Sequence, residues 1–288
     1  MGQMLAFRHA EFFPDRRLKS LRSVVIAGAG DLGARLAKLR VGLGEDVLAL
    51  RRRDVAVADG VRHLRVDLVS GAGFSRLPRR PDALVFCAAP DKRDEAAYRA
   101  LNVDGLRRLL DALDVPRLIF VSSTAVYGED AGEWVDETTP GLPGQFNGRV
   151  LLDAERELAA HGGAVALRLS GIYGPGRDLM LRRAREGSAN RPRWSNRIHV
   201  DDAAVALSRL LDVPAPERLY LGSDDRPALE CEIQSWLRVR EDLPPVLQAA
   251  GPETGRRISN ARLRASGWQP RYADYRAGYA ELLRIASL

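Results

Sequence analysis

The sequence predicts an α/β protein with a Rossmann-like, doubly wound parallel sheet and a smaller C-terminal substrate lobe. From Val24 onward, short apolar runs alternate with longer helical patterns. A G-x-G-x-x-G spacing follows the first run directly. After about residue 170 this alternation loosens, and glycine, proline and arginine become denser. We therefore expect an N-terminal extension over residues 1–20, a dinucleotide-binding domain over 21–170, and over 171–288 mainly the small lobe, with segments that return to the sheet.

Each element has a local signal. Residues 23–28 (SVVIAG) read as a buried strand, residues 29–44 as a turn into a helix ended by Gly42 and Gly44, and residues 46–50 (DVLAL) as the second strand. Further strands are predicted at residues 61–66, 82–88, 117–123, 164–170 and 218–223, and further helices at 95–113, 150–161 and 201–212. In the helix over 95–113, leucines recur at helical spacing and leave arginines on the outer side.

The composition favours a soluble, cytoplasmic protein. With 288 residues and 45% apolar side chains, the chain can bury an ordinary core. It contains no run of eighteen apolar residues and no signal-peptide pattern at its start, so we expect no contact with membranes. Cys87 and Cys231 lie far apart in a cysteine-poor chain. We therefore expect a reduced compartment, no disulfide framework and no metal site.

The net charge of +6 is weak support for nucleic-acid binding. Of the 44 basic residues only Lys19, Lys38 and Lys92 are lysine, and acidic residues are spread through the whole chain. A nucleic-acid site needs a clustered basic stripe, often with stacking aromatic side chains. A solvated basic surface is therefore the favoured interpretation, and the expected partner is a small-molecule substrate.

The first predicted crossover has the spacing of a dinucleotide-binding turn. Gly28 permits the tight turn, Gly30 lets a pyrophosphate approach the backbone, and Gly33 allows the helix and strand to pack closely. The helix dipole and free N–H groups face the anion, so Asp31 and Leu32 are also predicted to contact the cofactor. The alternative is that these glycines serve only a tight turn.

The end of the second predicted strand favours NADP(H) over NAD(H). Near this position an NAD(H) site places an acidic residue that binds the ribose 2′-hydroxyl. Here Arg51, Arg52 and Arg53 follow instead, and a guanidinium can fork onto a 2′-phosphate. We predict that Arg51 and Arg52 contact the cofactor. A solvated surface run is the alternative.

Further motifs follow in order along the chain. They are RVDL (65–68), VFCAAP (85–90), YRALNVDGLRRLLDAL (98–113), FVSSTAVYG (120–128), LRLSGIYGPGR (167–177), RIHVDDAAVAL (197–207) and the segment 256–283. Together they resemble the extended short-chain dehydrogenases/reductases, the family of NAD(P)-dependent epimerases and dehydratases, over residues 22–285. The resemblance implies that Asp67 lies near the adenine, and that Leu68 and Ala88, from the first two motifs, also belong to the cofactor site.

The family's Tyr-x-x-x-Lys pair has no counterpart here. In the family, the tyrosine exchanges a proton with the substrate, and the lysine lowers the tyrosine pKa. Counted from AERELA, the two positions fall on Asn147 and Leu151; shifted by one residue, they fall on Phe146 and Val150. Neither register restores the pair.

Two hydroxyl groups remain as catalytic candidates. Ser123 matches the family serine, and Tyr127 ends the same motif. The alternatives are that the Ser123 hydroxyl only satisfies backbone at a strand end, and that Tyr127 packs under a loop.

The resemblance also implies a substrate side. Arg177 and Arg197 occupy stretches that line it in relatives, Tyr173 lies in one of these stretches, and Arg149 is the nearest cation to the vacant lysine position. These four residues are the candidates for a small, sugar-derived or anionic substrate, with surface placement as the alternative for the arginines.

Other residues nearby are expected to be structural. His199 is interpreted as structural, and Asp201 and Asp202 as an N-cap with first-turn charge. Trp194 either covers a pocket or packs.

Two functions stay open from the sequence. One is an epimerase/dehydratase-like oxidoreductase that uses NADP(H) with degenerate catalytic residues. The other is a catalytically silent NADP(H) sensor. The resemblance also implies a homodimer through a helix that begins near Arg149.

Overall fold

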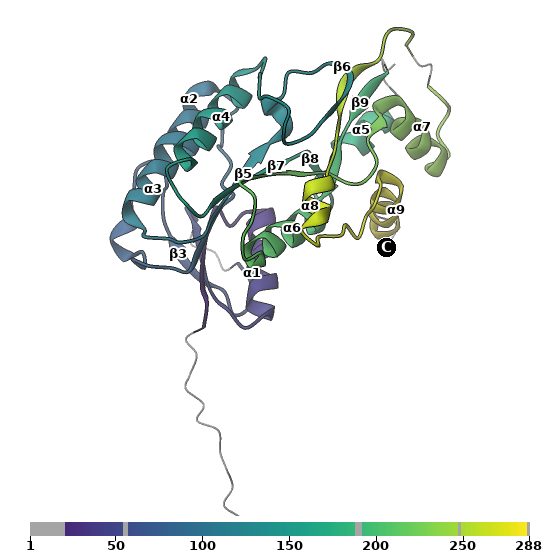
Figure 1. Cartoon of the computed structure of the whole chain (residues 1–288). Coiled ribbons are helices and arrows are strands. Elements are labelled where there is room, and N and C mark those ends of the chain that lie inside the picture. Colours follow the sequence, from purple (N-terminus) through teal and green to yellow (C-terminus); the bar gives the residue numbers. More distant parts are fainter. Residues whose placement is uncertain (1–20, 54–56, 188–191, 247–248, 287–288) are drawn as a thin grey trace, which may run out of the picture.

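A seven-stranded parallel sheet in the order β11-β7-β5-β4-β1-β2-β3 forms the centre of the fold (Figure 1). The computed structural model describes residues 21–53, 57–187, 192–246 and 249–286, so the extension expected over 1–20 lies outside the described residues. The sheet strands are β1 (Ser23–Ala27), β2 (Asp46–Arg51), β3 (Arg62–Arg65), β4 (Ala83–Phe86), β5 (Leu118–Ser123), β7 (Ala164–Leu169) and β11 (Leu219–Gly222). All seven were predicted, and the predicted fold class is confirmed.

Helices cover both faces of this sheet (Figure 1). On one face, α1 (Asp31–Gly42) packs against α6 (Val200–Asp212). On the other lie α2 (Glu95–Arg99), the π turn η2 (Ala100–Gly105), α3 (Leu106–Ala112) and α4 (Phe146–Leu158). Successive strand residues alternate between the two cores: Val25 and Ala27 of β1 pack on the α3 and α4 side, and Val24 and Ile26 pack on the α1 and α6 side. This two-sided burial explains why the central strands are continuous apolar runs.

Two helices differ from their predicted form. The helix over 95–113 contains the π turn, in which the Asn102 side chain donates a hydrogen bond to the Tyr98 carbonyl (3.1 Å) and Gly105 lies close to the Leu68 carbonyl. The helix predicted from residue 150 begins earlier, at Phe146, whose ring packs edge-on against Tyr98 with 5.5 Å between centroids.

The remaining elements include two smaller sheets besides further helices and turns. A four-stranded sheet has the order β12-β9-β13-β6, and β8 pairs with β10. Their bounds are β6 (Ala131–Val135), β8 (Gly171–Tyr173), β9 (Arg193–Ser195), β10 (Arg197–His199), β12 (Ala228–Leu229) and β13 (Thr254–Ile258). Alongside are α5 (Leu179–Glu186), α7 (Glu230–Arg240), α8 (Ala261–Ala265) and α9 (Tyr275–Ala286), and two short 3-10 turns are η1 (Phe74–Arg76) and η3 (Thr124–Val126).

The N-cap of α6 is His199, so the prediction that Asp201 and Asp202 form the cap is wrong, whereas the predicted acidic charge of these two residues in the first turn is confirmed. His199 is buried, and burial lowers its pKa, which favours the neutral ring. Its Nδ1 atom accepts the Asp201 N–H at 3.2 Å. Asp202 instead accepts the N–H groups of Arg271 (2.8 Å) and Tyr272 (3.0 Å), which ties α6 to the segment before α9.

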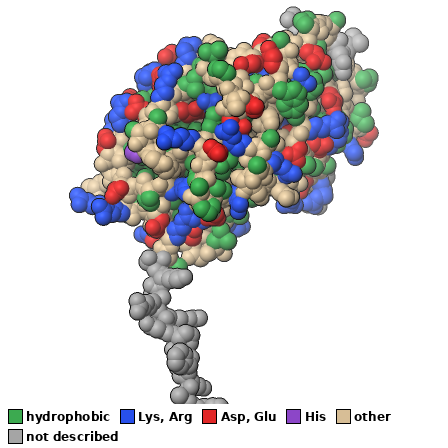
Figure 2. All heavy atoms as spheres, viewed as in Figure 1, with side chains coloured by type: hydrophobic (Ala, Val, Ile, Leu, Met, Phe, Trp, Pro, Cys, Tyr) green, Lys and Arg blue, Asp and Glu red, His purple; other side chains and the backbone are tan. Residues whose placement is uncertain are grey.

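The visible surface mixes charges of both signs. On the face in Figure 2, basic and acidic side chains are interspersed with apolar and neutral ones. Within the described ranges, every helix falls short of the length and apolarity that crossing a bilayer requires.

Arg40 of α1 is a buried cation that joins two helices to the start of β2. Its side chain is 1% exposed, and its guanidinium bonds the carboxylates of Glu45 and Asp212. Burial opposes ionisation of Asp212, but the hydrogen bonds and positive charges of Arg40 and Arg22 together outweigh it and lower the pKa of Asp212. The contact fastens the end of α6 to α1.

We expect Arg40→Met to lower the free energy of unfolding by about 3 kcal/mol, because two carboxylates lose their buried cation. Because the folded-state pKa of Asp212 is lowered, its stabilisation is present above the unfolded value of about 3.9 and is lost as pH falls through the folded value. Urea unfolding followed by circular dichroism should show a decline in wild-type stability below about pH 4 that is shallower in the variant. Lys38→Met, an exposed change on the same helix, should cost less than about 0.5 kcal/mol. Equal losses in both variants would contradict this account.

Candidate functional site

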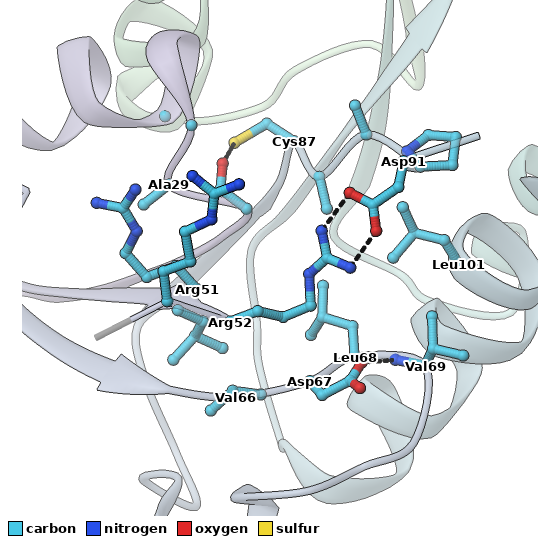
Figure 3. A pocket seen from close by; sticks show the side chains of 18 of the residues that line it. Ala29, Arg51, Arg52, Val66, Asp67, Leu68, Val69, Cys87, Asp91 and Leu101 are labelled. Atoms are coloured by element: carbon cyan, nitrogen blue, oxygen red, sulfur yellow. Dashed lines mark hydrogen bonds and ion pairs between the residues drawn. The ribbon is translucent and has the colours of Figure 1, made fainter. Parts of the chain in front are cut away.

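A pocket of about 910 Å³ opens at the carboxyl ends of β1, β2 and β4 (Figure 3). The chain leaves β1 toward β2 on one side and places β4 on the other, so the strand order reverses here. Two adjacent connections that run to opposite sides leave a crevice at the end of a parallel sheet. The topology therefore explains why a pocket lies at this point.

The glycine turn forms the floor of the pocket. Gly28 has φ +97°, and a Cβ atom there would lie 2.3 Å from the backbone of Ala88, so β1 and β4 converge as only glycine allows. A Cβ at Gly33 would lie 2.6 Å from the Gly28 carbonyl oxygen. At Gly30, by contrast, a Cβ would meet nothing within 4 Å. Gly30 thus borders open space in front of the first-turn N–H groups of α1, which have no partner within the helix.

Asp31 places a carboxylate at this helix start, and two arginines neutralise it. Arg35 donates to one carboxylate oxygen at 2.9 Å and Arg177 to the other at 3.0 Å. Burial of Asp31 opposes ionisation, but these hydrogen bonds prevail and lower its pKa. Arg177 comes from the segment between β8 and α5, so this segment reaches the rim of the pocket through the contact with Asp31.

The end of β2 lines the pocket with cations. Arg51, Arg52 and Arg53 all belong to its wall. Figure 3 shows Arg52 reaching toward the loop after β4, where both of its terminal nitrogens contact the carboxylate of Asp91. The pocket wall thus carries a cluster of guanidinium groups where an NAD(H) site would place an acid.

The opposite wall is mostly apolar. It consists of Leu68, Val69, Ala97, Ala100 and Leu101, from the end of β3 and the start of the helix after β4. A flat aromatic group fits such a wall.

Asp67 provides an acceptor at the edge of this wall. Its carboxylate accepts the Val69 N–H at 2.9 Å. Burial works against ionisation, yet the hydrogen bonds from Val69 and Ser70 lower the pKa of Asp67. Asp67 is therefore an ionised acceptor at neutral pH.

Cys87 lies directly beneath the glycine turn. Its Sγ lies 3.3 Å from the Gly28 carbonyl oxygen and can donate to it. Burial raises the pKa of its thiol to about 12, so it is no thiolate at neutral pH. Within the described ranges, no three His, Cys, Asp or Glu side chains cluster in a way that could hold a metal ion.

The structure brings all the predicted cofactor residues to this one pocket. They are Gly28, Gly30, Asp31, Leu32, Gly33, Arg51, Arg52, Asp67, Leu68 and Ala88. Sequence reasoning missed Asp91 and Lys92 in the loop after β4, and the apolar residues from Ala97 to Leu101. The available signal was their position directly after a strand of the nucleotide half, where binding loops lie.

Ser123 lies at the carboxyl end of β5, outside the lining of this pocket. Its Oγ accepts the Ala125 N–H at 3.2 Å, which leaves its own proton available to donate. Asn147 stands in the first turn of α4, and its Oδ1 is buried without a hydrogen-bond partner. The neighbouring Gly148 packs against the Ala125 carbonyl, so α4 brings Asn147 close to the turn after Ser123.

Tyr127 is a core residue, which corrects the expectation that its hydroxyl serves as an acid. It is 2% exposed, its ring packs under the Arg168 guanidinium at 4.9 Å, and its hydroxyl donates to the Asp136 carbonyl at 3.1 Å. Burial raises its pKa further. The phenol is therefore committed to a structural contact.

Two of the four substrate candidates are also buried. Tyr173 stacks on Tyr279 with ring centroids 4.7 Å apart, and the hydroxyl of Tyr173 faces Gly278 of α9. Arg197 is 4% exposed and donates to the Ser195 hydroxyl at 2.9 Å. The expectation that both line a substrate surface is corrected, because α9 covers β8 and β10.

The other candidates lie nearer the surface. Arg149 is exposed and donates to the Gly144 carbonyl at 3.3 Å, whereas Arg177 lies on the pocket rim. Trp194 packs against Arg257 and donates to Glu253 at 2.7 Å.

Comparison with known proteins gives consistent matches. Residues 24–222 match the sequence profile of the NAD dependent epimerase/dehydratase family. Protein YeeZ of Escherichia coli strain K12 is 38% identical over 220 residues, with 69% of this chain and 77% of YeeZ covered. A Methylobacillus flagellatus structure assigned as an NAD-dependent epimerase/dehydratase is 38% identical, with a TM-score of 0.82 over 93% of this chain and 100% of that one. UDP-glucose 4-epimerase of Thermus thermophilus, solved with NAD, has a TM-score of 0.72 at 23% identity over 90% and 96% of the two chains, a likeness of fold alone.

Substitution of Gly30 should weaken nucleotide binding, whereas substitution of Gly28 should lower stability. We expect Gly30→Val to fold normally but to weaken pyridine-nucleotide binding at least about 100-fold, because the new side chain fills the space before the α1 amides. Gly28→Ala should lower the free energy of unfolding by about 3 kcal/mol, because it combines positive φ with a clash against Ala88. Thermal unfolding and calorimetric titration separate the two effects. Undiminished binding by Gly30→Val would rule out this turn as an anion site.

Tyr127→Phe should reduce the free energy of unfolding by about 1 kcal/mol, because it removes one hydrogen bond, although the Asp136 carbonyl still accepts the Thr139 N–H. Nucleotide binding and any turnover should match the wild type. Loss of turnover in a normally stable variant would restore Tyr127 as a catalytic residue.

Proposed function

This chain belongs to the NAD dependent epimerase/dehydratase family, and from that premise we propose that it binds NADP(H) and transfers hydride to or from a small, sugar-derived or anionic substrate. The observation that carries the proposal is the cluster of Arg51, Arg52 and Arg53 on the wall of the nucleotide pocket. Guanidinium groups there favour a 2′-phosphate over a bare 2′-hydroxyl.

The residues of the pocket fit a dinucleotide. The open space at Gly30 admits a pyrophosphate to the first-turn amides of α1, and the ion pairs of Asp31 with Arg35 and Arg177 remove the repulsion that a free carboxylate would exert. The apolar wall that includes Ala100 and Leu101 suits the adenine, with Asp67 as an acceptor at its edge.

The nicotinamide supplies the hydride chemistry, and the protein must hold a substrate carbon close to it. Ser123 keeps a proton to donate to a substrate oxygen, since its own oxygen already accepts the Ala125 N–H. The unpartnered Oδ1 of Asn147, in the first turn of α4 near the turn after Ser123, offers a hydrogen-bond acceptor. A carboxamide orients a hydroxyl but takes no proton at neutral pH, so water must exchange the proton.

This arrangement predicts a slow enzyme. The position of the family tyrosine holds Asn147, and the phenol of Tyr127 is committed to the core. Absence of a positioned acid or base costs about 10²- to 10⁴-fold in rate.

One contact favours a catalytically silent NADP(H) sensor as the second candidate. Arg177 of the small lobe bonds Asp31 at the start of α1, beside the proposed pyrophosphate site. A bound nucleotide would change the electrostatic potential at the Arg177–Asp31 contact. The segment after β8 could then move, and a partner protein could bind one position of this segment in preference to the other. A cytoplasmic location and a homodimer remain predictions, which fractionation and light scattering would test.

We expect calorimetry to give tighter binding of NADPH than of NADH. The double variant Arg51→Gln, Arg52→Gln should weaken NADPH binding at least about 100-fold, because each of the two guanidinium–phosphate contacts is worth about 1.5–3 kcal/mol, and should change NADH binding less than about threefold. Arg62→Gln is the matched control, since Arg62 pairs with Asp46 at the opposite end of β2 and β3. Equal affinity of the wild type for both nucleotides would contradict the NADP(H) preference.

Oxidation of NADPH over a panel of carbonyl substrates separates the two functions. Turnover that falls at least about tenfold in Ser123→Ala and persists in Tyr127→Phe supports the enzyme. Tight nucleotide binding without turnover of any substrate supports the sensor.

A further inference from the structure

We propose that Asp91 is a specificity-determining residue that competes with the cofactor 2′-phosphate for the guanidinium of Arg52. This inference rests on the proposed function, because it concerns how the same pocket distinguishes NADP(H) from NAD(H). Neither the glycine turn nor the arginine run assigns a role to Asp91.

The geometry of the Arg52–Asp91 pair allows Asp91 to compete with a phosphate for the Arg52 guanidinium. Both terminal nitrogens of Arg52 contact the two carboxylate oxygens of Asp91, a two-pronged contact across 39 positions of sequence. Figure 3 shows the two side chains meeting over the pocket, one from the end of β2 and one from the loop after β4. A guanidinium that grips a carboxylate along one edge cannot present that edge to a phosphate.

Charge decides which partner Arg52 takes. A phosphomonoester carries a charge of about −1.5 to −2 and three acceptor oxygens at neutral pH, whereas Asp91 carries −1. A ribose 2′-hydroxyl carries no charge and cannot displace the carboxylate. We therefore expect Arg52 to move to the 2′-phosphate when NADP(H) binds and to stay on Asp91 when NAD(H) binds.

The Arg52–Asp91 ion pair is weak enough for Arg52 to exchange Asp91 for a phosphate. The Arg52 and Asp91 side chains are 56% and 63% exposed, and ion pairs this open contribute about 0–1 kcal/mol. The pair therefore lowers NADP(H) affinity by a modest factor without blocking it. It also holds Arg52 in place when no phosphate is present.

A second cavity can receive the Arg52 side chain after it leaves Asp91, together with the 2′-phosphate that it binds. A cavity of about 410 Å³ adjoins the first and is lined by Arg52, Arg65, Arg76 and Asp67 among others. Among the residues that the structure describes, Arg52 is the only arginine that lines both of these cavities. Once it leaves Asp91, it faces a region in which two further guanidinium groups favour a phosphate.

The test is Asp91→Asn, which keeps the shape of the side chain and removes its charge. We expect calorimetric titration to show NADPH binding strengthened about three- to fivefold, with NADH binding changed less than twofold. Adenosine 2′,5′-bisphosphate and 5′-AMP should show the same contrast, because they differ only in the 2′-phosphate. Glu95→Gln is the control, since it removes the same charge four residues along the chain and outside the pocket lining. In the background of Arg52→Gln, the gain from Asp91→Asn should disappear.

Three results would overturn the inference. NADPH binding unchanged by Asp91→Asn would show no competition. Equal strengthening of NADPH and NADH would reduce Asp91 to a general repulsive charge. Weaker binding of both NADPH and NADH would show that the Arg52–Asp91 pair holds the adenosine. If the wild type binds neither nucleotide, the proposed function itself fails and this inference with it, whereas unselective effects in a protein that binds NADPH refute the role of Asp91 alone.

Discussion

The close approach of Gly28 to the backbone of Ala88 is the constraint on which the nucleotide side of the molecule depends. A side chain at this point would force β1 and β4 apart, because its first carbon would lie 2.3 Å from the Ala88 backbone. The convergence sets the direction in which the chain turns into α1. It therefore aims the first-turn amides into the crevice between β2 and β4. The thiol of Cys87 reinforces the junction from below through the Gly28 carbonyl.

The sequence predicted this half well because its signals are local. A strand, a glycine spacing and a helix start lie within a dozen residues, and each requires only short-range geometry. The ends of β2 and β3 could be placed by counting strands. The pairing of Arg52 with Asp91 could not, because it depends on how a loop from a third strand folds over the pocket.

The substrate side was predicted less well because burial there depends on distant packing. Tyr173 and Arg197 are covered by α9, which lies about eighty residues or more further along the chain. Tyr127 is held by Asp136, at the end of β6, and β6 itself pairs with β13 from near the end of the chain. Aromatic and charged side chains in a family motif suggest a surface role, and nothing in their local spacing reveals the elements that cover them.

The two margins of the large sheet bear on self-association. β3 is four residues long and carries Arg62 and Arg65 as exposed side chains, and β11, at the opposite margin, is contacted by α8. Charged side chains on a short edge strand disfavour its pairing with an identical edge, and a helix beside the other edge hinders the addition of a strand. Neither edge of the sheet therefore favours pairing with a strand of another molecule. Copies of this protein that associate should do so through helical surfaces, and the concentrated protein should resist forming fibrils.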